Sequence, residues 1–205
     1  MKKYKINEIF LSLQGEGINA GRAAVFVRFS GCNLKCPFCD TDFSSYDSLD
    51  ADEVTSRICE ACGDNPLPKL CVITGGEPTL QLDEVLINAI HGLGMEVAME
   101  TNGTGQVPDG VDFVTVSPKS PFVGGKASEV IVDHASEVKV VMTEQISVEE
   151  IRAFEAIKAH YYFIQPCDTG FIGPNKRIMQ RCVEFVECHP NWRLSLQQQK
   201  ILNVR

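Results

Sequence analysis

"AAVFVRFSGCNLKCPFC", residues 23–39, joins a short apolar segment to a loop that carries three cysteines. The first eight residues, 23–30, are rich in Val and Phe, which is typical of a strand buried on both faces of a parallel sheet. Cys32, Cys36 and Cys39 follow directly. Three thiolates are one fewer than the four that close a structural zinc site or saturate an iron–sulfur cluster. The stretch therefore predicts a parallel strand followed by a metal centre with one open coordination position.

Five further segments have the same character as the first strand. They are short, rich in Val, Ile and Phe, and bounded by turn residues: 70–74, 95–100, 111–117, 137–142 and 161–166. Helical patterns separate most of them, and strand–helix alternation with right-handed crossovers gives a parallel α/β sheet. Six strands are too few for a complete eight-stranded barrel. We therefore expect a partial, incomplete TIM-like barrel of about six parallel strands.

Helix signals fall between the predicted strands. Asp50 with Glu53, and Ser147 with Glu150, stand in the spacing of a capping box, in which each side chain caps the other residue's backbone N–H. By contrast, the connection 101–110 is too rich in Gly and Pro for a helix. The segments expected to be helical are 49–62, 79–94, 147–160 and about 175–187.

Composition and charge limit the classes of partner. The 205 residues include 19 Lys and Arg against 27 Asp and Glu, a net charge of −8. This balance argues against a broad phosphate-binding face and so against nucleic-acid partners. No stretch approaches the roughly 18 apolar residues of a membrane span, and no secretory signal is visible. We expect a cytoplasmic protein without a membrane partner, whose nine cysteines are metal ligands or free thiols rather than disulfides.

Polar clusters follow the predicted strands at the point where each strand ends. Because the carboxyl ends of parallel strands meet at one edge of the sheet, clusters far apart in the sequence should converge there. This convergence predicts an active site on that rim. Besides the cysteine loop, the clusters are "GGEP" (75–78), "TNG" (101–103), "SPK" (117–119) and "QPCD" (165–168).

The three cysteines allow two kinds of metal centre. Asn33 and Pro37 make the segment loop-like, so the chain can wrap around a cube and present three sulfurs to three irons. A [4Fe–4S] cluster held this way keeps its fourth iron free for an outside ligand. The alternative is a zinc site completed by a distant His or Cys, which we favour less because none of the four histidines lies nearby in the sequence.

The spacing CxxxCxxC, with Phe38 before the last cysteine, resembles the signature of the radical S-adenosylmethionine (SAM) superfamily. "GGEP" at the end of the second strand matches its second hallmark. The resemblance implies a single radical SAM domain, 1–205, that holds a [4Fe–4S] cluster. SAM binds its open iron, and one electron from the reduced cluster splits SAM into a 5′-deoxyadenosyl radical that abstracts a hydrogen atom from the substrate.

Further blocks narrow the resemblance to the 7-carboxy-7-deazaguanine synthases, and they span the chain: "INEIFLSLQGEG" (6–17), 21–43, "VITGGEP" (72–78), "ETNGT" (100–104), "VTVSPK" (114–119) and "NWRLSLQQQKILN" (191–203). This resemblance implies a lyase that converts 6-carboxy-5,6,7,8-tetrahydropterin to 7-carboxy-7-deazaguanine with loss of ammonia, on the route to queuosine and other 7-deazapurines. It also implies Mg²⁺ as a cofactor, SAM regenerated after each turnover, a homodimer, and a low-potential flavodoxin or ferredoxin as electron donor.

The same resemblance assigns roles to individual residues. It implies that Cys32, Cys36 and Cys39 ligate the cluster and that the hydroxyl of Thr41 binds Mg²⁺. SAM would contact Phe38, Cys39, Asp40, Gly76 with its neighbours Gly75 and Glu77, Ser117, Pro118, Lys119, and the segment Gln165, Pro166, Cys167 and Asp168, in which we give the Cys167 thiol no role of its own. The pterin would contact Leu13, Gln14, Gly15, Arg28 and Thr74, with Arg28 clamping its carboxylate, and also the C-terminal carboxylate if Arg205 is the native end.

Several alternatives remain open. A glycyl-radical-enzyme activase, another small radical SAM class, would act on a protein rather than a pterin. A zinc or iron–sulfur binding module would have no enzymatic activity. Among single residues, Cys59 and Cys62 form a second CxxC but fit free thiols on a helix. Arg28, on an apolar strand, could instead form a structural ion pair, and Glu16 could be either solvated or part of the binding site.

Overall fold

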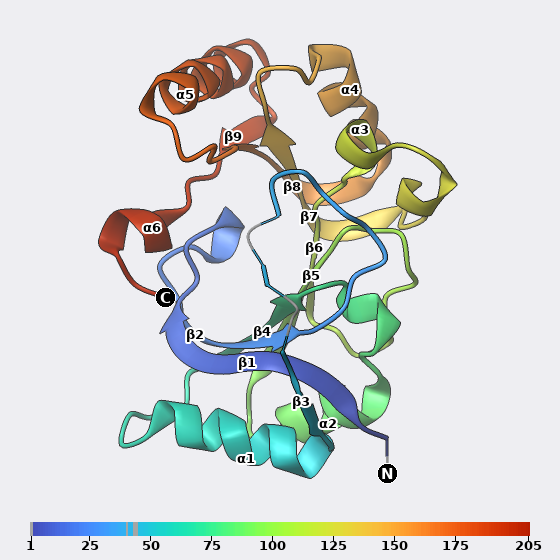
Figure 1. Cartoon of the computed structure of the whole chain (residues 1–205), viewed down its shortest axis with the longest axis vertical. Helices are drawn as coiled ribbons and strands as arrows, with labels where there is room; N and C mark the ends of the chain where they lie inside the picture. The colour runs from blue at the N-terminus through green and yellow to red at the C-terminus, as the bar shows by residue number, and fades with distance from the viewer. Residues whose placement is uncertain (1, 40, 43–44) are drawn as a thin grey trace.

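The computed structural model describes residues 2–39, 41–42 and 45–205. Its centre is one sheet of nine strands in the order β3-β1-β2-β4-β5-β6-β7-β8-β9 (Figure 1). From β2 to β9 neighbouring strands are parallel, whereas β1 is antiparallel to both β2 and β3. The strands are β1 (Tyr4–Leu13), β2 (Ala23–Phe29), β3 (Asp47–Leu49), β4 (Leu70–Gly75), β5 (Glu96–Thr101), β6 (Phe113–Val116), β7 (His134–Met142), β8 (Lys158–Pro166) and β9 (Trp192–Leu194).

This sheet confirms the expected partial barrel. All six predicted strands form, as β2, β4, β5, β6, β7 and β8, and they are consecutive in the sheet. The sequence patterns missed three strands. Short β9 adds a seventh parallel strand, while β1 and β3 extend the other edge in the antiparallel sense.

β1 escaped prediction because a bulge interrupts its alternation. The pairing register with β2 shifts between Ile6 and Glu8. Tyr4 and Ile6 pack in the outer core under the helices, whereas Phe10 belongs to the cluster on the opposite face of the sheet. One extra residue thus moves the even-numbered side chains from one face to the other. No simple period-2 pattern runs through the segment.

The helices lie on the outside of the curved sheet. Figure 1 shows α1 and α2 beside β1–β5, and α4 and α5 beside β7–β9. Both predicted capping boxes form, at Asp50 with Glu53 and at Ser147 with Glu150. As expected, no helix lies in the connection between β5 and β6, all of whose residues are described. The helices are α1 (Ala51–Cys62), α2 (Glu84–Gly92), α3 (Ser120–Val123), α4 (Val148–Ala153), α5 (Ile172–Cys188) and α6 (Gln198–Leu202), with 3-10 turns η1 (Gly17–Asn19), η2 (Pro78–Leu80), η3 (Lys126–Ser128) and η4 (Phe154–Ala156).

The inner face of the sheet changes character along each strand. A small apolar cluster fills its amino-terminal half: Phe10, Ala24, Phe26, Leu70, Val72 and Ala98. Two residues further along β2, β4 and β5, the same face carries Arg28, Thr74 and Glu100, because alternate residues of a strand share a face. The barrel therefore has an apolar floor beneath a polar upper layer, at the end where parallel α/β folds bind ligands.

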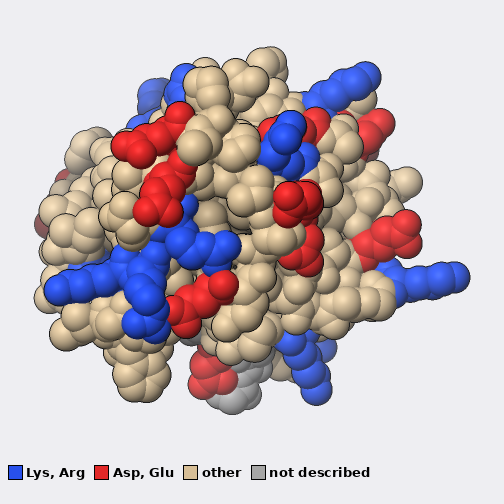
Figure 2. Space-filling view, turned by 90° about the horizontal axis from the view of Figure 1, so that it is seen from above, with Lys and Arg blue, Asp and Glu red and all other residues tan. Residues whose placement is uncertain are grey.

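The surface agrees with the charge balance. On the face seen from above, several Lys and Arg side chains gather on one side, and Asp and Glu side chains lie directly beside them (Figure 2). Among the described residues, no helix is both long enough and apolar enough to cross a bilayer.

Candidate active site

A cavity of about 290 Å³ opens at the carboxyl ends of the parallel strands. Its wall takes residues from the loops after β2, β4, β5, β6 and β8, together with side chains of the strands themselves. Each polar cluster that follows a predicted strand contributes to this wall. The predicted convergence on one rim is therefore confirmed.

The cysteine loop forms one side of the cavity. Cys32, Cys36 and Cys39 all line it, and all three are free thiols. Burial raises the pKa of Cys32 and of Cys36, and for Cys36 the nearby positive charge of Lys119 acts in the opposite direction. The N–H groups of Leu34 and Cys39 fold the loop, donating to Cys32 Sγ (3.4 Å) and to the Cys36 carbonyl (3.2 Å). Three thiols on one wall fit a cluster held by three ligands, with the remaining side facing the cavity.

The loop after β4 packs directly under the cysteine loop. The Gly76 N–H donates to the Phe29 carbonyl (2.8 Å), and the Glu77 N–H donates to the Gly31 carbonyl (3.0 Å). A Cβ atom on Gly76 would overlap the Gly31 carbonyl oxygen. Only glycine therefore allows the two loops to approach this closely.

Glu77 is 1% exposed and fully engaged by hydrogen bonds. Its carboxylate accepts from the Thr101 hydroxyl (2.6 Å), the Asn102 N–H (2.8 Å) and the Thr79 hydroxyl (2.7 Å). It thus joins the loops that follow β4 and β5. The buried carboxylate has a structural task at the site, beside any contact with SAM.

The close approach at Gly76 gives a direct prediction. In Gly76→Ala the new methyl group should push the Gly31 carbonyl and the cysteine loop away, at a cost of about 1–3 kcal/mol. We expect iron bound per chain after anaerobic reconstitution to fall well below the wild-type value. Gly92→Ala is the matched control, because no atom lies within 4 Å of its Cβ position. Equal iron content in both variants would contradict the prediction.

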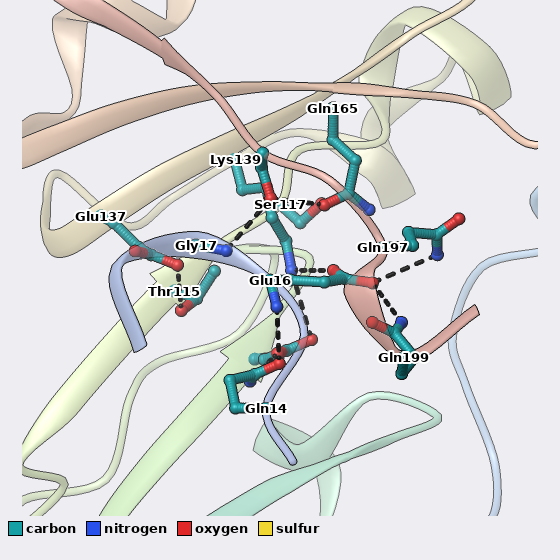
Figure 3. Close-up of polar contacts among 12 residues, drawn as sticks. Gln14, Glu16, Gly17, Thr115, Ser117, Glu137, Lys139, Gln165, Gln197 and Gln199 are labelled. Carbon is teal, nitrogen blue, oxygen red and sulfur yellow. Dashed lines mark hydrogen bonds and ion pairs between the residues drawn. The ribbon is translucent and has the colours of Figure 1, made fainter. Parts of the chain in front are cut away.

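The polar layer holds a buried charged group. Lys139 of β7 is 5% exposed at its side chain and pairs with Glu16, and its Nζ lies 3.6 Å from Glu100 Oε2 (Figure 3). Gln197 and Gln199 donate to the other oxygen of Glu16, at 3.1 and 3.0 Å. Burial favours the neutral form of Glu16, but the charge of Lys139 and these hydrogen bonds lower its pKa from 4.5 to about 2. Glu16 is therefore a residue of the cavity wall with a side chain only 12% exposed, rather than a solvated one.

The loop that carries Glu16 is held in place by residues of two later strands, β7 and β8, and by the segment that follows β9. The Gly17 N–H donates to the Ser195 hydroxyl (3.0 Å), which in turn donates to Gln165 Oε1 (2.9 Å). The Ile18 N–H donates to Glu137 (2.9 Å), whose carboxylate leaves no room for a side chain at Gly17. In Figure 3 the labelled residues Gly17, Glu137 and Gln165 lie around this loop. Residues from opposite ends of the sequence therefore shape one wall.

Most of the predicted SAM-binding residues line the same cavity as the cysteines. Lys119 donates to the Ser117 carbonyl and hydroxyl (2.8 and 2.6 Å), and burial lowers its pKa to about 8. The Phe38 ring meets Phe122 edge-on, with centroids 4.8 Å apart. Asp168 forms an ion pair with Lys200 (2.9 Å), so α6 is tied to the loop after β8. These contacts fix the side chains that face the cysteines.

The predicted pterin-binding residues divide into two groups. Arg28 and Thr74 are partners in the β2–β4 register and both line the cavity. Arg28 also forms an ion pair with Glu8 (3.0 Å). The structural ion pair that the sequence left open for Arg28 is therefore present. Gln14 lies behind the wall and donates to Glu100 (3.0 Å). Arg205 contacts Glu8 too, which places the C-terminal residue beside Arg28.

Most of the predicted residues thus share one cavity. Its wall includes Arg28, Cys32, Cys36, Phe38, Cys39, Thr41, Thr74, Gly76, Ser117, Lys119, Gln165, Pro166, Cys167 and Asp168. Five lie outside the wall: Leu13, Gln14, Gly15, Pro118 and Arg205. Asp40 is outside the described residues. The sequence analysis gave no role to Glu100, Lys139, Gln197 or Gln199, although a lysine inside the apolar strand "VKVVM" was a signal for a buried charge.

A larger recess of about 650 Å³ lies elsewhere, between 120–133 and 153–157. It contains none of the cysteines and none of the predicted binding residues. The smaller cavity is therefore the candidate active site, because the chemistry-bearing side chains gather there.

Comparisons with known proteins agree with this site. The radical SAM superfamily model matches residues 26–121. The 7-carboxy-7-deazaguanine synthases of Bacteroides thetaiotaomicron and Bordetella pertussis are 42% and 41% identical to this chain; the alignments cover 98% of it and 98% and 99% of those proteins. The crystal structure of QueE from Escherichia coli matches with a TM-score of 0.78 at 26% identity, covering 95% of this chain and 94% of that one. The resemblance drawn from the motifs is confirmed, and the chain belongs to the 7-carboxy-7-deazaguanine synthase family of radical SAM enzymes.

Proposed function

We propose that the chain converts 6-carboxy-5,6,7,8-tetrahydropterin to 7-carboxy-7-deazaguanine and releases ammonia. The observation that carries the proposal is a single cavity lined both by the three cysteines and by a layer of charged and amide side chains. Relatives over 40% identical along nearly their whole length carry the name of this activity. A pterin has a polar edge and a carboxylate, which such a wall can bind.

A [4Fe–4S] cluster with SAM supplies the one-electron cleavage and the hydrogen abstraction when both are bound. Cys32, Cys36 and Cys39 are the residues that would hold the cluster. The SAM contacts that we propose are the backbone at Gly76, the residues 38–40, the segment Ser117, Pro118 and Lys119, and the segment 165–168. The chain's own part is to place these groups around one cavity and to exclude water from it.

The substrate would lie on the opposite side of the cavity. Arg28, with its guanidinium beside Thr74, would bind the pterin carboxylate as a bidentate fork. The segment Leu13, Gln14 and Gly15 would support the ring from behind the wall, since Gln14 donates to Glu100 (3.0 Å). The Arg205 side chain, which shares Glu8 with Arg28, would lie at the same end of the substrate.

Mg²⁺ would bind at Thr41, which lines the cavity two residues after the last cluster cysteine. Mg²⁺ takes few protein oxygens and shares the rest of its shell with substrate and water. In Thr41→Ala we expect Mg²⁺-dependent turnover to fall about ten-fold or more, while SAM affinity stays within about two-fold. Thr41→Ser keeps the hydroxyl and should retain turnover. A matching loss of SAM affinity in Thr41→Ala would contradict the assignment.

The test of the function is a single anaerobic reaction. Reduced, reconstituted enzyme is incubated with SAM, Mg²⁺ and the carboxy-tetrahydropterin, and ammonia, deazaguanine product and remaining SAM are measured. We expect product and ammonia in equal amounts and SAM largely recovered. An intact cluster without ammonia or product would refute the proposal. A glycyl radical formed on an added partner protein would instead favour the activase, and a colourless zinc protein a binding module.

We further propose the setting in which the enzyme works. The chain would act as one radical SAM domain over 1–205, which fits a single sheet that includes strands from residues 4 to 194. It would form a homodimer and receive electrons from a low-potential flavodoxin or ferredoxin. Nine cysteines, none of them in a disulfide among the described residues, fit the reducing cytoplasm.

A further inference from the structure

Two asparagine side chains join the cysteine loop to the loop after β5. Asn33, directly after Cys32, accepts a hydrogen bond at Oδ1 from Asn102 Nδ2 (3.0 Å). The other end of the same amide, Asn33 Nδ2, donates to the Thr104 hydroxyl (2.7 Å). Both ends of the Asn33 amide are therefore held by the segment 102–104. We call these two asparagines the amide pair.

Asn102 is in turn rigidly supported. It is 7% exposed, and its backbone N–H donates to the buried Glu77 carboxylate (2.8 Å). Its own Oδ1 accepts from the Thr104 N–H (2.9 Å), which fixes the orientation of the amide. Glu77 also binds the Gly31 carbonyl through its backbone N–H (3.0 Å). The cysteine loop is thus held on both sides of Cys32, at Gly31 and at Asn33.

We propose that Asn102, acting through Asn33, is a positioning residue that orients Cys32 and keeps the Leu34 N–H on its sulfur, and thereby sets how readily the cluster is reduced. The Leu34 N–H lies 3.4 Å from Cys32 Sγ, one residue after the amide pair. The inference rests on the proposed function only in that Cys32 ligates a [4Fe–4S] cluster.

The physical link is the charge that reduction adds to the cluster. An N–H donor at a ligating sulfur stabilises that negative charge, so hydrogen bonds to the sulfurs shift the cluster potential upward. Without the amide pair, Asn33 can rotate and the turn over Leu34 opens. The cluster then accepts an electron less readily, although all three thiolates are still present.

Thr104 offers the mildest test, because Val has nearly its shape and lacks only the hydroxyl. In Thr104→Val the Asn33 Nδ2 loses its acceptor, and the ratio of reduced to oxidised cluster at a fixed potential should fall about ten-fold, the effect of one hydrogen bond of about 1.4 kcal/mol. Thr104→Ser restores the hydroxyl and should restore the ratio. The ratio is measured by electron paramagnetic resonance during a redox titration without the pterin.

A double-mutant cycle tests the amide pair itself. Asn102→Ala should lower the ratio, and Asn33→Ala should lower it at least as far because it also loses the bond to Thr104. The double variant should lower it no further than Asn33→Ala, because the Asn33–Asn102 bond is already absent there. Asn65→Ala is the matched control: its Nδ2 donates to the Cys62 carbonyl (3.1 Å) on α1, away from the cavity. Wild-type ratios in the single variants, or single effects that multiply in the double, would overturn the inference.

Two readouts keep the result interpretable. If Asn102→Ala does not fold, the comparison of Thr104→Val with Thr104→Ser still tests the inference. In the apo-protein, loss of the amide pair should speed alkylation of Cys32 by iodoacetamide relative to Cys188, an exposed cysteine outside the loop; an unchanged rate counts against the inference. A wild-type enzyme that reduces normally but forms no deazaguanine would refute the proposed function and leave this inference standing.

Discussion

Replacing any one of Cys32, Cys36 or Cys39 with Ala abolishes assembly of the [4Fe–4S] cluster, and with it turnover. The three thiols lie on one cavity wall, within the eight residues 32–39 of a single loop. The other cysteine of this wall, Cys167, follows β8 and is not part of the cysteine loop, so a variant with two ligands has no third thiolate within that loop. We expect product formation to fall by more than about a thousand-fold, because the reaction has no other source of hydrogen abstraction. Iron and sulfide content and visible absorption after anaerobic reconstitution give the measurement.

Other cysteines provide the matched controls. Cys59 lies on α1 and Cys188 at the end of α5, and both are exposed. Their Ala variants should bind a full cluster and keep wild-type turnover, which also tests the view that Cys59 and Cys62 are free thiols. A variant of Cys36 that still carried four irons and still formed product would show that this cysteine is not a ligand.

Lys139→Met should destabilise the fold by about 3–5 kcal/mol, the usual cost of removing one partner from a buried ion pair. Met has nearly the same length as Lys but leaves Glu16 and Glu100 beside each other without a cation. In the wild type the depressed pKa of Glu16, from 4.5 to about 2, corresponds to roughly 3 kcal/mol. Chemical denaturation at pH 7 measures the loss. Turnover should fall about a hundred-fold as well, because the wall that holds the substrate is displaced.

The pH dependence separates a lost charge pair from a packing defect. In the wild type the stability supplied by Glu16 is present above pH 4.5 and is lost as the pH falls toward 2. In Lys139→Met burial raises the pKa of Glu16 above 4.5, so the variant regains stability as the pH falls through the raised value. Adding Glu16→Gln should recover part of the loss at pH 7. Lys158→Met, an exposed lysine on β8, should be close to neutral, and a Lys139→Met deficit independent of pH would contradict the pairing.

The sequence was most informative where one strand carries both an apolar pattern and a charged residue on the same face. In "AAVFVRFS" the inner-face positions are Ala24, Phe26 and Arg28, so the pattern itself places a charge one step above an apolar floor. The strand-end clusters could be assigned to one rim because parallel topology leaves only one arrangement of their carboxyl ends. Most of the cavity wall follows from these two facts.

The parts that escaped prediction depend on contacts that no local pattern encodes. β1 was missed because its bulge between Ile6 and Glu8 exchanges the faces midway. β9 has only three residues, which are too few to show the period-2 alternation of a strand. The partners of Lys139 come from the N-terminal loop and from β5, and only the assembled sheet brings Glu16, Glu100 and Gln199 together.

The contact between Gly17 and Ser195 has a consequence for biosynthesis. A ribosome delivers the cysteine loop and the strands beneath it long before residues 195–199 emerge. The cysteine loop and the strands beneath it can thus form on a nascent chain before Glu16 meets Gln197 and Gln199. A chain that stopped just before Ser195 would lack the groups that hold Gly17 and Glu16 in the cavity wall.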